Sequence, residues 1–213
     1  MYDRIPINIL IAGVGGQGNL LASRLLADVA LEKDYQVAIG ETKGASQRSG
    51  SVTSHVRFSS SPQGPLIPRG SAHIIVGFEP LETLRASRKY SSPKTTVLVD
   101  SAPIVPMMVA QGLQHYPPLD EILSELDSLN KHVYVVEATE LARTAGNPIV
   151  MNVVMLGALC GLRLLPFARE QFADSIDRNV PTKHRKLNRR AFEGGYEQGR
   201  MHRATGREED THA

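Results

Sequence analysis

The first regular pattern along the chain is an apolar run that ends in a cluster of glycines. Residues 7–12 read INILIA, and GVGGQG follows at residues 13–18. Leucine and valine then recur every three or four residues as far as about Lys33, which is the spacing of one helix face. This order predicts a buried strand, a tight turn, and a helix that covers a sheet.

Strand and helix patterns then alternate. Short apolar or alternating runs predict strands at residues 35–39, 51–58, 72–76, 95–99 and 131–136. Helical spacing predicts helices at 79–87 and 119–129, whereas 59–70 and 101–118 are rich in Pro, Gly or Ser and predict loops. Such alternation predicts an α/β fold: a three-layer, Rossmann-like, mostly parallel sheet with helices on both faces.

The last third of the chain predicts two further helices of opposite character. Asn147 and Pro148 form a good helix start, and the residues that follow are apolar on every face, so this helix should be buried. Residues 178–207 hold nine Lys or Arg against Glu193 and Glu197, which fits either a solvated helix or a basic docking surface. We expect one domain over residues 1–203 and a polar tail at 204–213.

Composition narrows the classes of protein. With 213 residues, 41% of them hydrophobic, the chain can build one α/β core but not two comfortable domains. A net charge of +2 favours neither nucleic acid nor a membrane as partner. The single cysteine, Cys160, excludes an internal disulfide and any cysteine-rich cluster or zinc site built by this chain alone. We therefore expect a cytoplasmic protein with no metal site and an inert, buried thiol.

The glycine cluster carries the clearest chemistry. Gly13, Gly15 and Gly18 match G-x-G-x-x-G, with Gly16 and Gln17 between them. Glycine suits this place because backbone N–H groups must approach an anion at a helix N-terminus, where a Cβ would intrude. The alternative is purely structural, since close strand–helix packing can require the same glycines.

A second polar segment, ETKGASQRSGSVTSHVR, occupies residues 41–57. Gln47, Arg48 and Ser49 could donate hydrogen bonds to a phosphate or carboxylate, with Gly50 allowing a tight turn; a purely structural turn is the alternative. Glu41 follows the second predicted strand, near the place where dinucleotide-binding folds hold a ribose with an acid. His55 falls within an alternating strand, which favours a hydrogen-bonded structural histidine over a catalytic one.

Several separated motifs together resemble a known family. The segments at 13–18, 41–58, 74–85, 147–159 and 188–199 are similar, in the same order, to the gamma-type domain of 2-oxoacid:ferredoxin oxidoreductases, most of all its indolepyruvate type. The resemblance covers roughly residues 7–200, which makes it far more specific than the glycine motif alone.

The resemblance implies a subunit of a complex that oxidatively decarboxylates an aryl 2-oxoacid, forms an acyl-coenzyme A and CO2, and reduces ferredoxin. Thiamine diphosphate and [4Fe-4S] clusters are then expected in a larger partner subunit, with none held by this chain alone. This chain would help to hold coenzyme A or a substrate group. The candidate binding residues are Gly13, Gly15, Gly16, Gln17, Gly18, Glu41, Gln47, Arg48, Ser49 and Gly50.

Two other hypotheses remain open at this point. A stand-alone NAD(P)-binding enzyme would explain the glycine turn and Glu41, although no side chain stands out as its proton donor. A noncatalytic assembly module could dock through the basic helix. Partners under the family hypothesis are the larger subunit and, through the complex, ferredoxin; a homodimer in isolation is possible, and neither nucleic acid nor a membrane is expected.

Overall fold

The computed structural model describes residues 6–44, 50–104, 109 and 115–209. They form a six-stranded sheet in the order β2-β3-β1-β4-β5-β6. The strands are β1 (Ile7–Val14), β2 (Gln36–Lys43), β3 (Ser51–Ser59), β4 (Ile74–Gly77), β5 (Thr96–Asp100) and β6 (His132–Val136). The helices are α1 (Asn19–Leu31), α2 (Pro80–Tyr90), α4 (Leu119–Leu129), α5 (Ala138–Ala145), α6 (Met151–Gly161), α7 (Arg169–Asn179) and α8 (Thr182–Glu209), with a short 3-10 turn η1 (Pro148–Val150) before α6.

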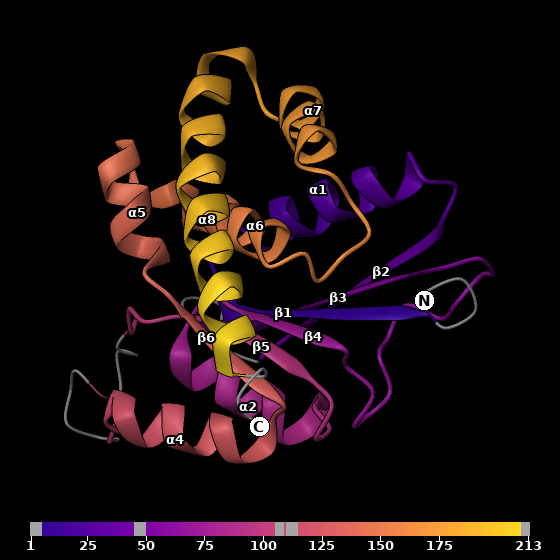
Figure 1. The fold of residues 1–213 in the computed structure, drawn as a ribbon. Helices are drawn as coiled ribbons and strands as arrows, with labels where there is room; N and C mark the ends of the chain where they lie inside the picture. The colour runs from indigo at the N-terminus through magenta and orange to yellow at the C-terminus, as the bar shows by residue number, and fades with distance from the viewer. Residues whose placement is uncertain (1–5, 45–49, 105–108, 110–114, 210–213) are drawn as a thin grey trace.

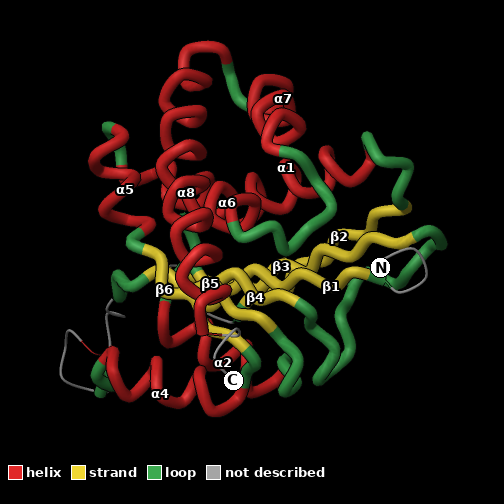
Figure 2. Tube along the Cα trace, viewed as in Figure 1, coloured by secondary structure: helices red, strands yellow, loops and turns green. Residues whose placement is uncertain are grey.

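The helices cover both faces of the sheet, so the predicted three-layer architecture is confirmed (Figures 1 and 2). Alternate residues of β1 point to opposite faces: Ile9 and Ile11 pack in the core under α1 and α6, whereas Leu10 and Ala12 pack in the core under α2 and α4. Strand β1 is therefore buried on both sides, which explains its unbroken apolar sequence.

Most predicted elements are present with small shifts at their ends. The difference that matters is β2, which was expected to stop near residue 39 but continues to Lys43, so that Glu41 lies inside the strand rather than after it. Helices α5 and α7 were not predicted. Helix α5 has only eight residues and buries mainly alanines, and α7 buries only Phe172 and Ile176 as large apolar side chains.

Strand β3 distinguishes this sheet from an ordinary dinucleotide-binding fold. It lies between β1 and β2 and runs antiparallel to both, so β1 and β2 point in the same direction without touching. In the common dinucleotide-binding order, β2 lies next to β1. Here the pairs Val14–Ser51 and Lys43–Val52 bring the ends of β1 and β2 and the start of β3 to one edge of the sheet.

Helices α6 and α8 cross at very short range. All residues of α6 are buried, as predicted. A Cβ on Gly157 would lie 2.1 Å from the Phe192 carbonyl oxygen, and one on Gly195 would lie 1.9 Å from that of Val154. Gly161 and Gly199 repeat the contact one turn further on. Glycines at four-residue spacing on both helices therefore allow the two backbones to touch.

The buried guanidinium of Arg57 fastens the loop at residues 60–70 to the sheet. Its side chain is buried and donates to Asn8 Oδ1 at 2.9 Å, to the Gly64 carbonyl at 2.7 Å and to the Leu66 carbonyl at 3.1 Å. Within the described ranges no carboxylate lies within 4 Å of it. Among the described residues, only neutral acceptors satisfy the guanidinium of Arg57. The conformation of the loop at residues 60–70 therefore depends on this side chain.

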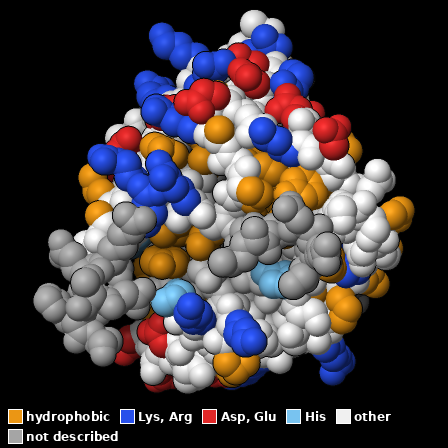
Figure 3. Space-filling view, turned by 45° about the vertical axis from the view of Figure 1, so that its right-hand side comes forward, with side chains coloured by type: hydrophobic (Ala, Val, Ile, Leu, Met, Phe, Trp, Pro, Cys, Tyr) orange, Lys and Arg blue, Asp and Glu red, His pale blue; other side chains and the backbone are white. Residues whose placement is uncertain are grey.

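Ion pairs hold α7 between α1 and α8. Arg178 Nη2 lies 2.8 Å from Asp28 Oδ2, and Arg189 of α8 pairs with Asp177. Figure 3 shows basic and acidic side chains intermixed over the top of the molecule, the level of α7 and the first turns of α8 in Figure 1. On this side of α8, at least part of the positive charge noted in the sequence is neutralised within the chain.

Candidate functional site

The glycine turn has the geometry expected of an anion cradle. Gly16 and Gly18 have φ of +99° and +82°, values that side-chain-bearing residues rarely adopt. Gly18 is also the N-cap of α1, and no side chain caps that helix start. The first N–H groups of α1 therefore remain available to an anion.

The side chain of Gln17 makes two hydrogen bonds that stabilise the glycine turn. Its Oε1 accepts a hydrogen bond from the Val14 N–H at 2.8 Å, and its Nε2 donates to the Phe78 carbonyl at 2.7 Å. A Cβ on Gly13 would lie only 2.6 Å from Gln17 Oε1. The structure thus gives Gln17 a role in joining the ends of β1 and β4, and its contact with a ligand stays a prediction.

A hollow of about 330 Å³, here called the turn hollow, opens beside the glycine turn on the α1 face of the sheet. It brings Glu41 and the glycine turn together, although they come from strands that do not touch. Glu41 is partly neutralised, because Lys43 Nζ lies 3.4 Å away and Ser54 Oγ donates to it at 3.4 Å. The lining residues are Val14, Gly15, Gly16, Gly18, Asn19, Leu20, Glu41, Lys43 and Val52.

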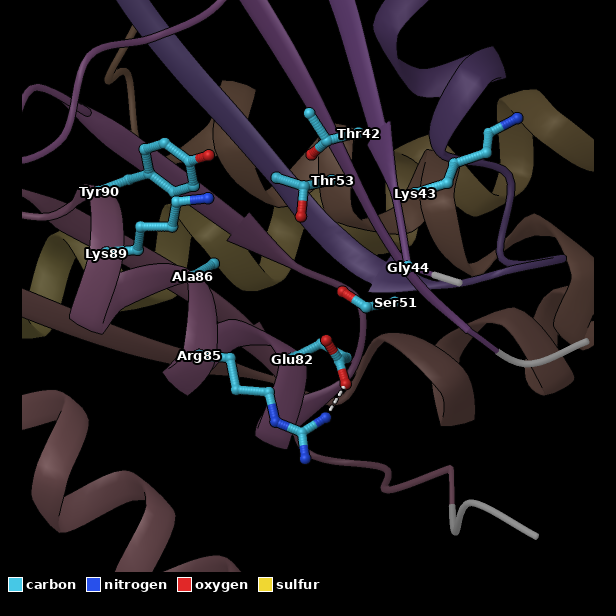
Figure 4. Close-up of a pocket in the computed structure, with 10 residues that line it drawn as sticks. All are labelled: Thr42, Lys43, Gly44, Ser51, Thr53, Glu82, Arg85, Ala86, Lys89 and Tyr90. Atoms are coloured by element: carbon cyan, nitrogen blue, oxygen red, sulfur yellow. Dashed lines mark hydrogen bonds and ion pairs between the residues drawn. The ribbon is translucent and has the colours of Figure 1, made fainter. Parts of the chain in front are cut away.

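A second hollow of about 320 Å³, here called the α2 hollow, opens on the opposite face of the sheet (Figure 4). Lys43, Arg85, Lys89 and Glu82 line it; Glu82 is paired with Arg85, whereas the Lys43 side chain points away from Arg85 and Lys89 and pairs with Glu41 on the other face. Lys89 has no ion-pair partner among the residues described, and its Nζ lies 4.8 Å from the centre of the Tyr90 ring. The lining residues are Thr42, Lys43, Gly44, Ser51, Thr53, Glu82, Arg85, Ala86, Lys89 and Tyr90.

Lys43 lines both hollows, which lie on either side of the connection between β2 and β3. Of the residues predicted in this connection, Gln47, Arg48 and Ser49 lie outside the described residues. Gly50 is described, and its carbonyl accepts a hydrogen bond from the Gly15 N–H at 3.0 Å. The structure therefore joins the two motifs that the sequence singled out, through one backbone contact.

The sequence reasoning missed the positive charge of the α2 hollow. Arg85 and Lys89 are four residues apart on α2 and so share a helix face, but nothing in the sequence alone places that face beside Lys43. The positive charge of the α2 hollow could have been predicted only if the position of β3 in the sheet, and with it the position of the end of β2, had been known.

Two buried carboxyl groups lie at the ends of β4 and β5 and were also missed. Glu79 accepts from the Glu82 N–H at 2.8 Å and from the Tyr116 hydroxyl, while Asp100 accepts from the Thr139 N–H at 3.2 Å. Burial raises the pKa of Glu79 and that of Asp100 above their usual values. Both bond to the first turn of a following helix, so their roles are structural.

Two predictions about single residues are confirmed. His55 is fully buried and its Nδ1 accepts a hydrogen bond from the Ile67 N–H at 3.2 Å, while burial, followed by the charges of Lys89 and Arg57, lowers its pKa. Cys160 is buried in α6, and burial raises the pKa of its thiol to about 12, so almost no thiolate forms at neutral pH.

No three His, Cys, Asp or Glu side chains of the described part of the chain are grouped so that they could hold a metal ion. None of the helices described is both long enough and apolar enough to cross a membrane. The two hollows offer backbone N–H groups, hydroxyls, the carboxylates of Glu41 and Glu82, and cations.

Comparison with known proteins places the chain in one family. Residues 8–198 match the pyruvate ferredoxin/flavodoxin oxidoreductase family. The indolepyruvate oxidoreductase subunit IorB of Thermococcus kodakarensis is 43% identical over 190 residues, which cover 88% of this chain and 93% of that one.

Solved structures show the same fold. The gamma subunit of the keto/oxoacid ferredoxin oxidoreductase from Geobacter sulfurreducens superposes with a TM-score of 0.67 at 23% identity and covers 92% of this chain and 99% of its own. The 2-oxoglutarate:ferredoxin oxidoreductase from Magnetococcus marinus, solved with 2-oxoglutarate, coenzyme A and succinyl-CoA bound, has a TM-score of 0.69 at 17% identity and covers 93% of this chain and 32% of its own.

Proposed function

The chain belongs to the pyruvate ferredoxin/flavodoxin oxidoreductase family, as a subunit of a 2-oxoacid oxidoreductase, and we propose that its complex oxidises indolepyruvate or a related aryl 2-oxoacid. In this reaction the bond between the carboxylate and the keto carbon breaks and CO2 leaves. The acyl group forms a thioester with coenzyme A, and the two electrons released reduce two ferredoxins. Identity of 43% to a protein named for indolepyruvate supports this substrate class. Residues 1–203 form the domain that takes part.

The cofactors of the reaction do not fit this chain. An iron–sulfur cluster needs several cysteine thiolates, and the one cysteine of the sequence is a buried thiol with a raised pKa. Thiamine diphosphate, which supplies the carbanion chemistry of decarboxylation, is therefore proposed to sit with the [4Fe-4S] clusters in a larger partner subunit. Ferredoxin is reached through that partner, and the complex is cytoplasmic.

Coenzyme A is the ligand that we propose for this chain. The observation that carries this proposal is the uncapped start of α1 at the glycine turn, next to two hollows that share Lys43. Backbone N–H groups at Gly16 and Gly18 would bind phosphate, because a helix start without a side-chain cap is a ready anion site, while the Gly15 N–H holds the Gly50 carbonyl beside them. Gly13 would allow the turn to form.

The β2–β3 connection completes this binding site in our proposal. Arg48, Gln47 and Ser49 would supply side-chain donors, with Gly50 fixed against the glycine turn by its backbone bond. Arg85 and Lys89 would attract the phosphates from the α2 face, and Lys43 would do so from the side of the turn hollow. Glu41 would face the bound ligand from β2.

A stand-alone NAD(P)-binding enzyme is the second candidate, favoured by the position of Glu41 in the turn hollow. Thermal unfolding of the isolated chain separates the two. A ligand that binds only the folded state raises stability by RT ln(1 + [L]/Kd), so the second candidate predicts a higher Tm with NAD or NADP. No shift with either dinucleotide, and a shift with coenzyme A, supports the first.

Gly16→Asp tests the coenzyme A site within the active complex. Gly16 has open space where a Cβ would be, but its φ of +99° strains any residue with a side chain, so Gly16→Asp is compared with Gly16→Ala, which carries the strain without the charge. We expect the KM for coenzyme A to rise at least about tenfold, which corresponds to about 1.4 kcal/mol of repulsion, while the KM for indolepyruvate stays the same. Gly64→Asp, at another open glycine far along the chain, is the matched control. An unchanged KM for coenzyme A in Gly16→Asp would refute this placement.

A further inference from the structure

A third hollow, of about 290 Å³, lies where the starts of α6 and α8 meet α1, and is here called the α6–α8 hollow. Its apolar lining includes Leu21 of α1, Val180 before α8 and Leu187 of α8. Asparagine side chains and His184 surround this apolar floor. Neither the fold nor the proposed coenzyme A site uses this hollow.

Ile149 is one of the residues that line the α6–α8 hollow, and its side chain is exposed to solvent. It is 70% exposed, more than any other large apolar side chain of the part of the chain that the structure describes. Its position is rigid, because it lies in the turn η1 after Pro148 and its N–H donates to Asn147 Oδ1 at 3.0 Å. A rigid, exposed apolar side chain beside a hollow is typical of an anchor in a protein interface.

A row of cations lies on α8 beside Leu187, which is one of the residues that line the hollow. Lys183, Lys186 and Arg190 are spaced by three and four residues on α8 and so lie along one face of the helix, next to Leu187. Within the described ranges none of the three has a carboxylate within 4 Å. Arg189, one residue away, is paired with Asp177, so the charge of the neighbouring face is partly neutralised within the chain.

The α6–α8 hollow lies next to the turn hollow. Leu20 lines the turn hollow and Leu21, the next residue of α1, lines the α6–α8 hollow. Asn152 lines the α6–α8 hollow and its Nδ2 donates to the Gly18 carbonyl at 3.1 Å. A protein seated over Ile149 would therefore border the glycine turn.

We propose that Ile149, the α6–α8 hollow and the cation row form the surface that binds the larger, thiamine-bearing subunit, through an apolar segment flanked by carboxylates. This rests on the proposed function. A second copy of this chain fits less well, because a two-fold contact through this surface would place the cation rows of both copies together. The partner also completes the site, since it covers Ile149 while bordering the turn that holds coenzyme A.

Ile149→Arg tests the surface in the co-expressed complex, with Leu31→Arg as the matched control, because Leu31 is 58% exposed at the far end of α1. We expect Ile149→Arg to weaken association with the larger subunit at least tenfold in equilibrium gel filtration, and Leu31→Arg to leave it unchanged. Equal association for both variants would overturn the proposal, and so would a contact between two copies of this chain through Ile149.

The double variant Lys186→Glu/Arg190→Glu tests the cation row, with Lys94→Glu as a control at the opposite edge of the sheet. These side chains are exposed, so the variants should fold. We expect association of the wild-type complex to weaken with added salt, and association of the double variant to be weaker at low salt and nearly independent of salt. If the double variant binds the larger subunit with wild-type affinity, the proposed binding surface is refuted while the proposed function stands. If the wild-type chain never binds the larger subunit, both the surface and the proposed function are refuted.

Discussion

The contact between α6 and α8 predicts opposite effects for two neighbouring glycines. In Gly195→Ala the new Cβ would lie 1.9 Å from the Val154 carbonyl oxygen, which is backbone and cannot rotate away. In Gly194→Ala the nearest atom outside its own helix turn is Leu141 Cδ2 at 3.9 Å, an ordinary contact. The two substitutions add the same methyl group to the same helix and differ only in what that group meets.

The size of each effect follows from these distances. To restore a 3.4 Å contact at residue 195, the helix backbones must separate by about 1.5 Å. Overpacking of this kind costs about 3 kcal/mol, and the gain of replacing glycine by alanine in a helix returns about 1 kcal/mol. We therefore expect Gly195→Ala to lower the free energy of unfolding by about 2 kcal/mol, and Gly194→Ala to raise it by up to about 1 kcal/mol.

Thermal and urea unfolding of the isolated chain measure both variants. For a domain of this length, about 1 kcal/mol shifts Tm by roughly 2–4 °C, so Gly195→Ala should melt about 4–8 °C lower and Gly194→Ala up to about 4 °C higher. If both variants shift in the same direction by similar amounts, the close approach of α6 and α8 does not limit stability and this reasoning is refuted.

Two more predictions concern buried polar groups. Arg57→Met leaves the Gly64 and Leu66 carbonyls without their donor, so the free energy of unfolding measured in urea should fall by about 3 kcal/mol. Limited proteolysis of this variant should cut within residues 60–70. Resistance to cleavage there would contradict the role of Arg57 in anchoring this loop. The lowered pKa of His55 means that the unfolded chain takes up a proton below pH about 6.5 while the folded chain does not. The stability of the wild type relative to His55→Asn should therefore decrease as the pH falls from 7.5 to 5.5, and a difference independent of pH would contradict this.

The sequence predicted the sheet and most of the helices because their apolar spacing is strong. All eight residues of β1 are buried, and an unbroken apolar strand followed by glycines and a helix has few other interpretations. It also predicted that α6 is buried, from apolar residues on every face. Helices α5 and α7 escaped prediction because their buried faces consist of alanines and two larger side chains.

The candidate site was predictable only in part. The glycine turn is a local motif, so its residues could be identified from the sequence, and the structure adds that Gly16 and Gly18 have positive φ values. The position of Glu41 depends on β3 lying between β1 and β2, which is a long-range pairing that local patterns do not encode. The same pairing brings Lys43 toward α2, and so the positive charge of the α2 hollow could not be predicted.

The most direct test of the account is turnover of the complex with and without this chain. The larger subunit would be purified anaerobically alone and then titrated with this chain, and reduction of ferredoxin or a viologen dye would be measured with indolepyruvate and coenzyme A. We expect no turnover from the larger subunit alone, and activity that rises with added chain until the two are stoichiometric. Full turnover by the larger subunit alone would contradict the claim that this chain completes the active site.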